Sequence, residues 1–338
     1  MKYKKLGALL LAGALALSLG ACSKSDDKDG DKDAGSNANG AITYPITFDS
    51  CGTKVTIEKE PKNVLSIGVA SGIFAANAAK KGQYTTRAGE LGEKNPLADE
   101  FGAKLWTDGE PGTEEIIEKG VDLVIADLYG KRDPQKLADA GIPIIIPSAL
   151  CHHAKSENPE LVSKTVEPSN LTAVATDIRE LGKVLNNTDA AEKAAKDYES
   201  RIEKAKADAP KDNRSAAFVF YFSKEYPIMS VGEGGVEGAL MQAVGLKNIF
   251  ADEKEAYIEE VNWESILKAD PDVIIIKYGR TGSTFEEDKA RFLKEPGAEN
   301  LKAVKNNHII GISNRQTWPS PGIAEGLETL VKDLKALQ

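Results

Sequence analysis

The chain has 338 residues, 41% of them hydrophobic and 28% charged, which is a globular composition and not a fibrous or disordered one. Its length suggests two domains. The net charge of −9 argues against binding to a nucleic-acid backbone, because that binding depends on Lys and Arg displacing counterions. Three cysteines and three histidines are too few for a zinc-ribbon array or a histidine-rich metal buffer.

The N-terminus has the layout of a secretory signal peptide, which we assign to residues 1–21. Lysines at positions 2, 4 and 5 precede a run of apolar or small residues at 6–19. This run is shorter than the roughly 20 residues that a permanent membrane span needs. It ends in Leu19-Gly20-Ala21-Cys22, which resembles the lipobox of bacterial lipoproteins and predicts a lipid on Cys22. The alternative is an ordinary signal peptide followed by an incidental cysteine.

Residues 22–40 form a predicted disordered tether. After Cys22 the segment consists of Ser, Asp, Lys, Gly, Asn and Ala and lacks any aromatic or large aliphatic residue. Such a segment buries too little apolar surface to offset the entropy lost on ordering. A lipid anchor with a tether predicts a protein on the extracytoplasmic face of a membrane, and it favours a Gram-positive surface over a periplasm.

The first half of the folded body, residues 41–187, alternates strands and helices. A hairpin is expected at 43–57, around Cys51-Gly52. The next expected elements are a strand at 63–68, a helix at 73–81, a strand at 121–126, a helix at 134–140 and a strand at 141–146. Short continuous apolar strands that alternate with helices indicate a parallel sheet covered on both faces.

The same rhythm restarts after a long helical region. An amphipathic helix is expected at 171–185, and a second helix begins at 188 or 189 and ends near 208, before Pro210. The second half, residues 210–338, then predicts strands at 216–221, 272–277 and 308–312 and helices at 237–244, 263–268 and 322–337. The sequence therefore predicts an α/β fold with two lobes of mainly parallel sheet, joined by one long bridging helix at 188–209.

The two halves share a sequence pattern. Residues 114–125, EEIIEKGVDLVI, parallel residues 264–275, ESILKADPDVII. Each segment has a glutamate, then an apolar pair, then an aspartate that opens a buried strand. This duplication indicates lobes related by a pseudo-two-fold axis, with Glu114 and Glu264 in matching positions.

Six segments carry a resemblance to a known family. They are PKNVLS (61–66), GEGGVEGALM (232–241), GLKNI (245–249), VNWESIL (261–267), PDVII (271–275) and LKAVKN (301–306). In this order they resemble the substrate-binding lipoproteins of ABC importers that take up ferric siderophores, haem or cobalamin. The resemblance covers nearly all of residues 41–338.

The resemblance implies a fold, a function and partners. It implies two Rossmann-like lobes with a ligand cleft between them, a monomer without a resident cofactor, and delivery of cargo to an ABC permease dimer with its ATPase. It also implies that Glu114 and Glu264 dock to arginines of the permease. The alternative is that each glutamate only stabilises the start of its helix.

Candidate ligand-binding residues follow from the rule that ligands bind beyond the carboxyl ends of strands in open α/β sheets. The candidates at predicted strand ends are Tyr129, Arg132, His152, Tyr221, Tyr278, Arg280, Arg315 and Trp318, and those in predicted loops of the first lobe are Arg87 and Trp106. Arginines bind carboxylate, catecholate or hydroxamate oxygens, and aromatic rings add flat apolar area. We therefore expect a locally positive cleft that binds a ferric siderophore, with haem and cobalamin as alternatives.

The pair His152-His153 raises the question of a direct iron ligand. On an extended segment adjacent side chains point in opposite directions, so at most one of them faces the cleft. That residue could ligate haem iron or complete an iron shell left open by a tetradentate catecholate, and the alternative is a histidine of the pocket rim. We take His152 as the candidate, as a possible indirect iron ligand. A bare zinc or manganese site is disfavoured, because such a site needs three or four converging ligands.

Cys51 and Cys151 remain after lipidation of Cys22, and an even pair outside the cytoplasm should oxidise to a disulfide. Some proteins of the resembled family also place a second cysteine at the position of Cys151. Two buried thiols are the alternative.

Enzymatic alternatives find little support. A Gly-x-Ser-x-Gly elbow, a His-Glu-x-x-His motif and a P-loop are all missing, and the segment 68–72, GVASG, has the wrong spacing for the elbow. The sequence thus disfavours a secreted hydrolase and favours a binding protein whose transport energy comes from a partner. A surface adhesin is a third, weaker alternative.

Overall fold

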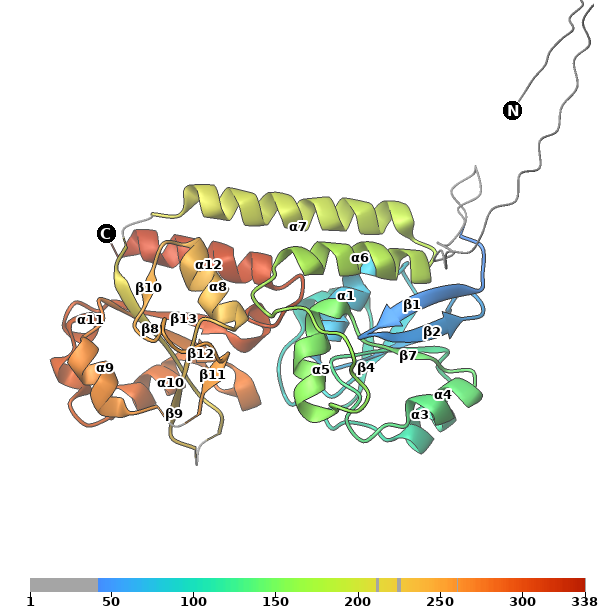
Figure 1. Ribbon diagram of the computed structural model, residues 1–338, viewed down its shortest axis with the longest axis horizontal. Helices are drawn as coiled ribbons and strands as arrows, with labels where there is room; N and C mark the ends of the chain where they lie inside the picture. The colour runs from blue at the N-terminus through green and yellow to red at the C-terminus, as the bar shows by residue number, and fades with distance from the viewer. Residues whose placement is uncertain (1–41, 211–212, 224–225, 260, 338) are drawn as a thin grey trace, which may run out of the picture.

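The computed structural model describes residues 42–210, 213–223, 226–259 and 261–337, and it shows two α/β lobes side by side (Figure 1). The predicted signal peptide at 1–21, the lipidation site Cys22 and the tether at 22–40 lie outside the described residues.

The N-terminal lobe is built on a five-stranded, wholly parallel sheet. In spatial order its strands are β5 (Lys104–Thr107), β4 (Tyr84–Ala88), β3 (Val64–Ile67), β6 (Leu123–Ala126) and β7 (Ile144–Ile145). Every residue of β3 and β6 is buried, which explains why both strands are apolar apart from Ser66 of β3. The direction of winding reverses between β3 and β6, the point at which ligands bind in such sheets.

Helices and one hairpin surround this sheet. The helices are α1 (Val69–Ala78), α2 (Pro96–Phe101), α3 (Thr113–Lys119), α4 (Pro134–Asp139), α5 (Cys151–Glu157) and α6 (Thr172–Val184), with a 3-10 turn η1 (Ser148–Leu150) before α5. The hairpin consists of β1 (Ile46–Ser50) and β2 (Thr53–Ile57), paired antiparallel as expected from the sequence.

The C-terminal lobe has a mixed sheet. Its strands follow the order β11 (Tyr257–Ile258), β9 (Ile228–Val231), β8 (Ser215–Tyr221), β12 (Val273–Tyr278) and β13 (Ile309–Ser313), with β10 (Lys247–Asn248) also beside β8. Strands β8, β10, β12 and β13 run parallel, whereas β9 and β11 add an antiparallel edge that we did not predict. The helices are α8 (Val236–Ala243), α9 (Trp263–Ala269), α10 (Phe285–Phe292), α11 (Lys302–Lys305) and α12 (Ile323–Ala336), and the 3-10 turns are η2 (Arg280–Gly282), η3 (Ala298–Asn300) and η4 (Asn314–Gln316).

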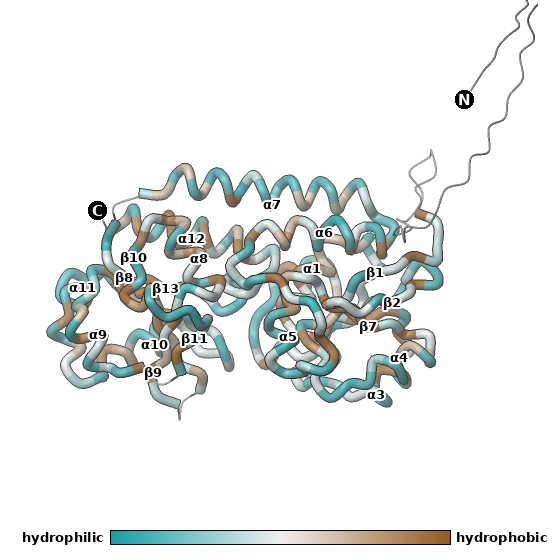
Figure 2. Tube along the Cα trace, in the orientation of Figure 1, coloured by the Kyte–Doolittle hydropathy of each residue, from teal (hydrophilic) through white to brown (hydrophobic). Residues whose placement is uncertain are grey.

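Helix α7 (Thr188–Asp208) runs along the outside of both lobes (Figure 1). Its buried residues are Ala191, Ala195, Tyr198, Ile202 and Ala205. They recur every three or four positions, so one face packs on α6 of the first lobe and α12 of the second while the rest meets water. The resulting alternation of hydrophilic and hydrophobic residues is visible along α7 (Figure 2). A single helix therefore spans the two lobes, and the predicted two-lobed α/β fold is confirmed.

The repeated sequence pattern corresponds to the same structural unit in each lobe. Helix α3 leads into β6, and α9 leads into β12. Strand β6 pairs with β3, the first strand of its sheet, and β12 pairs with β8, the first strand of the other. The duplication thus places equivalent helix–strand units beside the central strand of each lobe.

Three local predictions are wrong. Arg87 and Trp106 do not lie in loops, because they belong to strands β4 and β5, whose polar residues conceal them as strands in the sequence. His152 does not lie on an extended segment, because it belongs to helix α5.

No helix within the described residues is long and apolar enough to cross a membrane.

Candidate functional site

A cavity of about 750 Å³ lies between the lobes, within the range of small-molecule sites. Its first wall comes from the N-terminal lobe, from the segments that follow β3, β4, β5 and β6 and from α5. Its second wall comes from the C-terminal lobe, from the residues that follow β8, β12 and β13. The cavity therefore gathers the carboxyl ends of parallel strands from both sheets, as the rule for α/β proteins predicts.

The floor of the first wall is formed where the winding reverses, by Gly68 after β3 and Asp127 after β6. The Asp127 carboxylate accepts hydrogen bonds from the backbone N–H groups of Ser71, at 2.7 Å, and Ala70, at 3.4 Å, and so caps helix α1. Gly68 has φ 103°, and a Cβ at this position would lie 2.2 Å from Asp127 Oδ2. Burial raises the pKa of Asp127 to about 7.

Beside this floor lies an ion pair between Arg132 and Glu110, 3.3 Å apart. The Arg132 side chain is buried, and its Nη2 also donates to the backbone oxygen of Leu128 at 3.0 Å. Its Nε has no hydrogen-bond partner among the described residues. Burial lowers the pKa of Arg132, although Glu110 opposes this effect. A buried donor without a partner is rare in folded proteins, which marks this part of the wall as unusual.

The second wall presents a guanidinium on an aromatic ring. Arg280 stacks on Phe222 with its Cζ 4.0 Å from the ring centroid, and within the described ranges it has no ion pair. Desolvation by burial lowers the pKa of Arg280, while Glu93 across the cavity acts in the opposite direction. An arginine held in this way can bind ligand oxygens with its free edge.

His153 and Trp318 meet across the cavity, edge to face, with their ring centroids 5.0 Å apart. Burial, with smaller contributions from Arg280 and His152, lowers the pKa of His153 to about 4. The imidazole is therefore neutral at physiological pH, which leaves one ring nitrogen as an acceptor. Because α5 is helical, its two adjacent histidines diverge, and His152 is exposed and outside the cavity lining. The choice of His152 as the cleft-facing histidine is wrong.

Of the predicted ligand-binding residues, the structure brings Arg132, Arg280 and Trp318 to the cavity. Tyr129 turns the other way: it is buried, and its hydroxyl lies 2.9 Å from Ser50 Oγ under the β1–β2 hairpin. Arg87 is also buried and outside the lining, because it forms ion pairs with Glu90 and Asp99.

The remaining candidates lie elsewhere. Arg315 forms an ion pair with Glu325 at 2.6 Å, on the side of α12. Tyr221 donates to Glu295 at 3.0 Å in a smaller neighbouring pocket. Tyr278 packs on Phe285 with ring centroids 5.9 Å apart, and Trp106 lies under Lys119, whose Nζ is 4.8 Å from the ring. None of these four side chains lines the cavity.

Sequence reasoning missed the acidic residues. The carboxylates of the lining are Glu90, Glu93, Glu110, Asp127 and Glu157, against the cationic side chains Lys131, Arg132 and Arg280. The described lining thus has more acidic than basic side chains, and the expected predominance of basic side chains is wrong. Two of the acids, Asp127 and Glu93, are only partly ionised at neutral pH, because burial raises their pKa values to about 7. The same strand-end rule would have found Asp127, which directly follows β6, and Glu90, two residues after the end of β4, if candidates had not been restricted to partners for an anion.

Glu93 of the N-terminal lobe forms a hydrogen bond to the C-terminal lobe. Its Oε1 accepts a hydrogen bond from Nδ2 of Asn314, which follows β13. Burial raises the pKa of Glu93 to about 7, and the Asn314 hydrogen bond and the charge of Arg280 limit that rise. Asn314 was another residue that we did not predict, although it also follows a strand.

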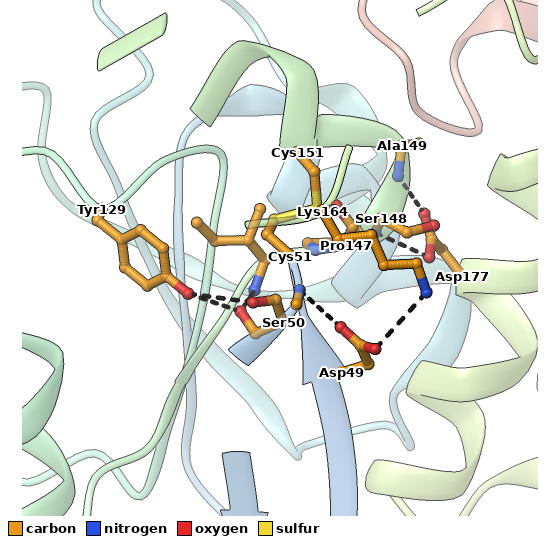
Figure 3. The surroundings of a disulfide bond; sticks show 12 residues. Asp49, Ser50, Cys51, Tyr129, Pro147, Ser148, Ala149, Cys151, Lys164 and Asp177 are labelled. Carbon is orange, nitrogen blue, oxygen red and sulfur yellow. Dashed lines mark hydrogen bonds and ion pairs between the residues drawn. A yellow bond between two sulfur atoms is a disulfide. The ribbon is translucent and has the colours of Figure 1, made fainter. Parts of the chain in front are cut away.

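A disulfide supports the wall that carries His153. The structure joins Cys51, at the tip of the β1–β2 hairpin, to Cys151, the first residue of α5, with a Cα–Cα distance of 5.3 Å (Figure 3). Asp177 of α6 accepts hydrogen bonds from the backbone N–H groups of Ser148, at 2.9 Å, and Ala149, at 2.8 Å. The start of α5 is therefore fixed from two sides.

The described residues contain no group of three or more His, Cys, Asp or Glu side chains arranged to hold a metal ion. The cavity has the size of a small-molecule site and lies between two lobes that helix α7 connects. This combination defines a two-lobed substrate-binding protein.

Comparison with known proteins agrees with this class. A profile of the periplasmic binding protein family matches residues 70–315, and the chain belongs to that family. Family members bind substrates for transporters, and the resemblance noted from the sequence is confirmed. The Bacillus subtilis (strain 168) protein YhfQ, provisionally named an ABC transporter substrate-binding lipoprotein, is 22% identical over 98% of this chain and 97% of its own length.

Solved structures share the fold at low identity. One is an ABC-type Fe³⁺-hydroxamate transport protein of Saccharomonospora viridis, with TM-score 0.66, 21% identity and coverage of 86% of this chain and 99% of the other. A Roseiflexus haem-binding protein, RhuT, has TM-score 0.63, 20% identity and coverage of 82% and 99%. The Vibrio cholerae vitamin B12-binding protein BtuF has TM-score 0.58, 21% identity and coverage of 82% and 98%.

Proposed function

We propose that the protein is the extracytoplasmic substrate-binding component of an ABC importer and that its cargo is a ferric siderophore. The cavity between the lobes carries this proposal. It is large enough for a bulky complex and combines an unpaired guanidinium, Arg280, with the rings of Phe222 and Trp318. Iron-coordinating oxygens suit the guanidinium, and the organic backbone of a siderophore suits the rings. The name of one structural neighbour, the Fe³⁺-hydroxamate transport protein, supports the same class of cargo.

Delivery of the cargo would use the two matching glutamates. Glu114 and Glu264 are exposed in the first turns of α3 and α9, which lie on the side of the molecule away from α7 (Figure 1). Glu114 pairs with Lys136, so a permease arginine would have to compete with this lysine. Two separated carboxylates would set the orientation of docking more than its affinity. We further propose that a lipid on Cys22 holds the monomeric protein at the outer face of a Gram-positive cell membrane.

Quenching of tryptophan fluorescence tests the proposal. Of the three tryptophans, Trp318 lines the cavity, whereas Trp106 and Trp263 lie outside its lining. A soluble form that begins after Cys22 would be titrated with a ferric hydroxamate, a ferric catecholate, haem and cobalamin. We expect saturable quenching by a ferric siderophore that is lost in Trp318→Phe and kept in Trp106→Phe.

Arg280→Ala should weaken binding of that siderophore about 10- to 100-fold, because hydrogen bonds to charged groups contribute about 1.5–3 kcal/mol. Arg315→Ala is the matched control and should leave the affinity unchanged, since Arg315 is occupied by Glu325 outside the cavity. Failure of every ferric siderophore to bind would refute the proposed cargo. An equal loss of siderophore affinity in Arg280→Ala and Arg315→Ala would show that the binding site is not the cavity that Arg280 lines.

Haem is a second candidate, because a neutral histidine lines the cavity. His153 could ligate haem iron without first losing a proton, since its pKa is lowered to about 4. If haem is the cargo, a Soret band should form with the purified protein and should shift or vanish in His153→Ala. His152→Ala is the control, because that side chain is exposed and outside the lining. A Soret band that is unchanged in His153→Ala would show that His153 does not ligate haem iron.

A further inference from the structure

The charge of the cavity limits which iron complexes it can hold. Two of its carboxylates are already neutralised, because Glu90 is paired with Arg87 and Glu110 with Arg132. A third, Glu157, is exposed at the rim with Lys131, where water screens both charges. Inside the described cavity, this leaves Glu93 and Asp127 without an ion pair and Arg280 as the unpaired cation.

Asp127 and Glu93 differ in their availability. Both carboxylate oxygens of Asp127 face backbone N–H groups of α1, so this side chain is engaged in the fold. Glu93 accepts one hydrogen bond, from Asn314, and its Oε2 has no partner among the described residues. Glu93 therefore offers an unused carboxylate oxygen at the junction of the lobes, and Arg280 faces it from the other wall.

We propose that the cavity selects ferric complexes of zero or positive net charge, and that Glu93 binds a protonated amine of the ligand. The proposal rests on the proposed function. Three hydroxamates balance the charge of Fe³⁺, whereas three catecholates leave the complex with a net charge of −3. One free guanidinium does not compensate such an anion, because a buried charge without a partner is costly. The carboxyl groups of Glu93 and Asp127, whose pKa values are about 7, would also have to stay protonated beside it. A trihydroxamate with a free amine fits both walls, its iron-bound oxygens near Arg280 and its ammonium near Glu93.

The same arrangement predicts how affinity depends on pH. Arg280 and Lys277 favour the charged form of Glu93, whereas Asp127 and burial oppose it, and the net result is a pKa of about 7. An ammonium binds the charged carboxylate, so it must displace the proton that Glu93 holds below pH 7. Affinity for the amine-bearing complex should therefore rise about tenfold from pH 6 to pH 8. A ligand without the amine should show a smaller rise or a fall.

A matched pair of ligands tests the proposal. One is a ferric trihydroxamate with a terminal amine, and the other is its N-acetylated derivative, which keeps the iron core and loses the charge. Quenching titrations of the soluble chain should show the amine form binding about tenfold or more tightly than the acetylated form, with a ferric tricatecholate weakest of the three. Glu93→Gln keeps the acceptor for Asn314 and removes the charge, so it should reduce the preference to less than about threefold and flatten the pH dependence. Glu58→Gln, an exposed acid after β2 outside the lining, is the control for net charge and should retain the preference.

The outcomes separate the two proposals. Equal affinity for the two hydroxamates, or tightest binding of the tricatecholate, would overturn the charge selection and leave ferric siderophore binding intact. A preference that persists in Glu93→Gln would overturn the role of Glu93. Binding of none of the three ferric complexes would overturn the proposed function and this inference with it.

Discussion

Replacing Lys277 with methionine should lower the free energy of unfolding by about 3–5 kcal/mol. Lys277 lies on β12 with 3% of its surface exposed, and its Nζ is 2.6 Å from Oε1 of Glu237, which is 1% exposed. Burial acts to lower the pKa of Lys277, but Glu237 and Tyr257 outweigh it and raise the pKa, so the lysine is charged. Its ammonium also lies 4.4 Å from the ring centroid of Phe220. The variant would leave the Glu237 carboxylate buried without a cation.

The pH dependence of this loss identifies its cause. An isolated buried carboxylate has a raised pKa, so folded Lys277→Met would bind a proton that the unfolded chain releases. The loss of stability in urea unfolding should therefore be larger at pH 8 than at pH 5. The double variant Lys277→Met with Glu237→Leu should recover most of the loss, because no lone charge remains.

An exposed ion pair provides the control for this measurement. Arg201 of α7 pairs with Glu328 of α12 at 2.7 Å, but both side chains are more than a third exposed. Arg201→Met should cost less than about 1 kcal/mol. If Lys277→Met lowers the free energy of unfolding by no more than Arg201→Met does, a buried carboxylate without a cation is not costly here. The argument from desolvation would then fail.

The sequence predicted the parts of the fold that burial determines. Strand β6 and residues 273–276 of β12 are covered on both faces, so they appear as uninterrupted apolar runs. Helix α7 shows the three-to-four spacing of a helix with one packed face. Strands β4 and β5 were missed, because polar residues fill them and β5 lies at a sheet edge with exposed residues. Strand β9 was missed because its role is antiparallel pairing with β8, a tertiary contact that no local pattern shows.

The location of the site was predictable, but the direction of its side chains was not. Strand ends gave the correct edge of each sheet, yet Tyr129 turns to Ser50 and Arg315 to Glu325. These choices depend on partners that are distant in sequence or on another element. Glu93 could not be assigned, because its importance comes from a hydrogen bond to Asn314, 221 residues away. The preference for arginines and tyrosines also concealed the acids, which outnumber the basic residues of the lining.

Loss of the Cys51–Cys151 disulfide should destabilise the protein by about 4–5 kcal/mol, according to the chain-entropy model for a closed loop of this size. The bridge joins residues 100 positions apart, and reduction lets the unfolded chain explore many more conformations. The double variant Cys51→Ala with Cys151→Ala avoids a reactive free thiol. Its unfolding midpoint in urea should match that of the wild type in reductant, and reductant should not lower it further.

The loss of stability should be larger in the N-terminal lobe, because the closed loop contains all five strands of that lobe's sheet and no strand of the other sheet. Trp106 of β5 lies inside the loop, and Trp263 of α9 lies outside it, so variants that retain one of these tryptophans report on separate lobes. If the unfolding midpoint reported by Trp106 falls more than that reported by Trp263, the lobes unfold separately. Equal falls in the two midpoints would show that α7 couples the lobes into one cooperative unit. An unchanged midpoint at both probes would contradict the stabilising role of the bridge. Because Asp177 independently fixes the turn before α5, the variant should still position His153 and bind ligand under conditions in which it remains folded.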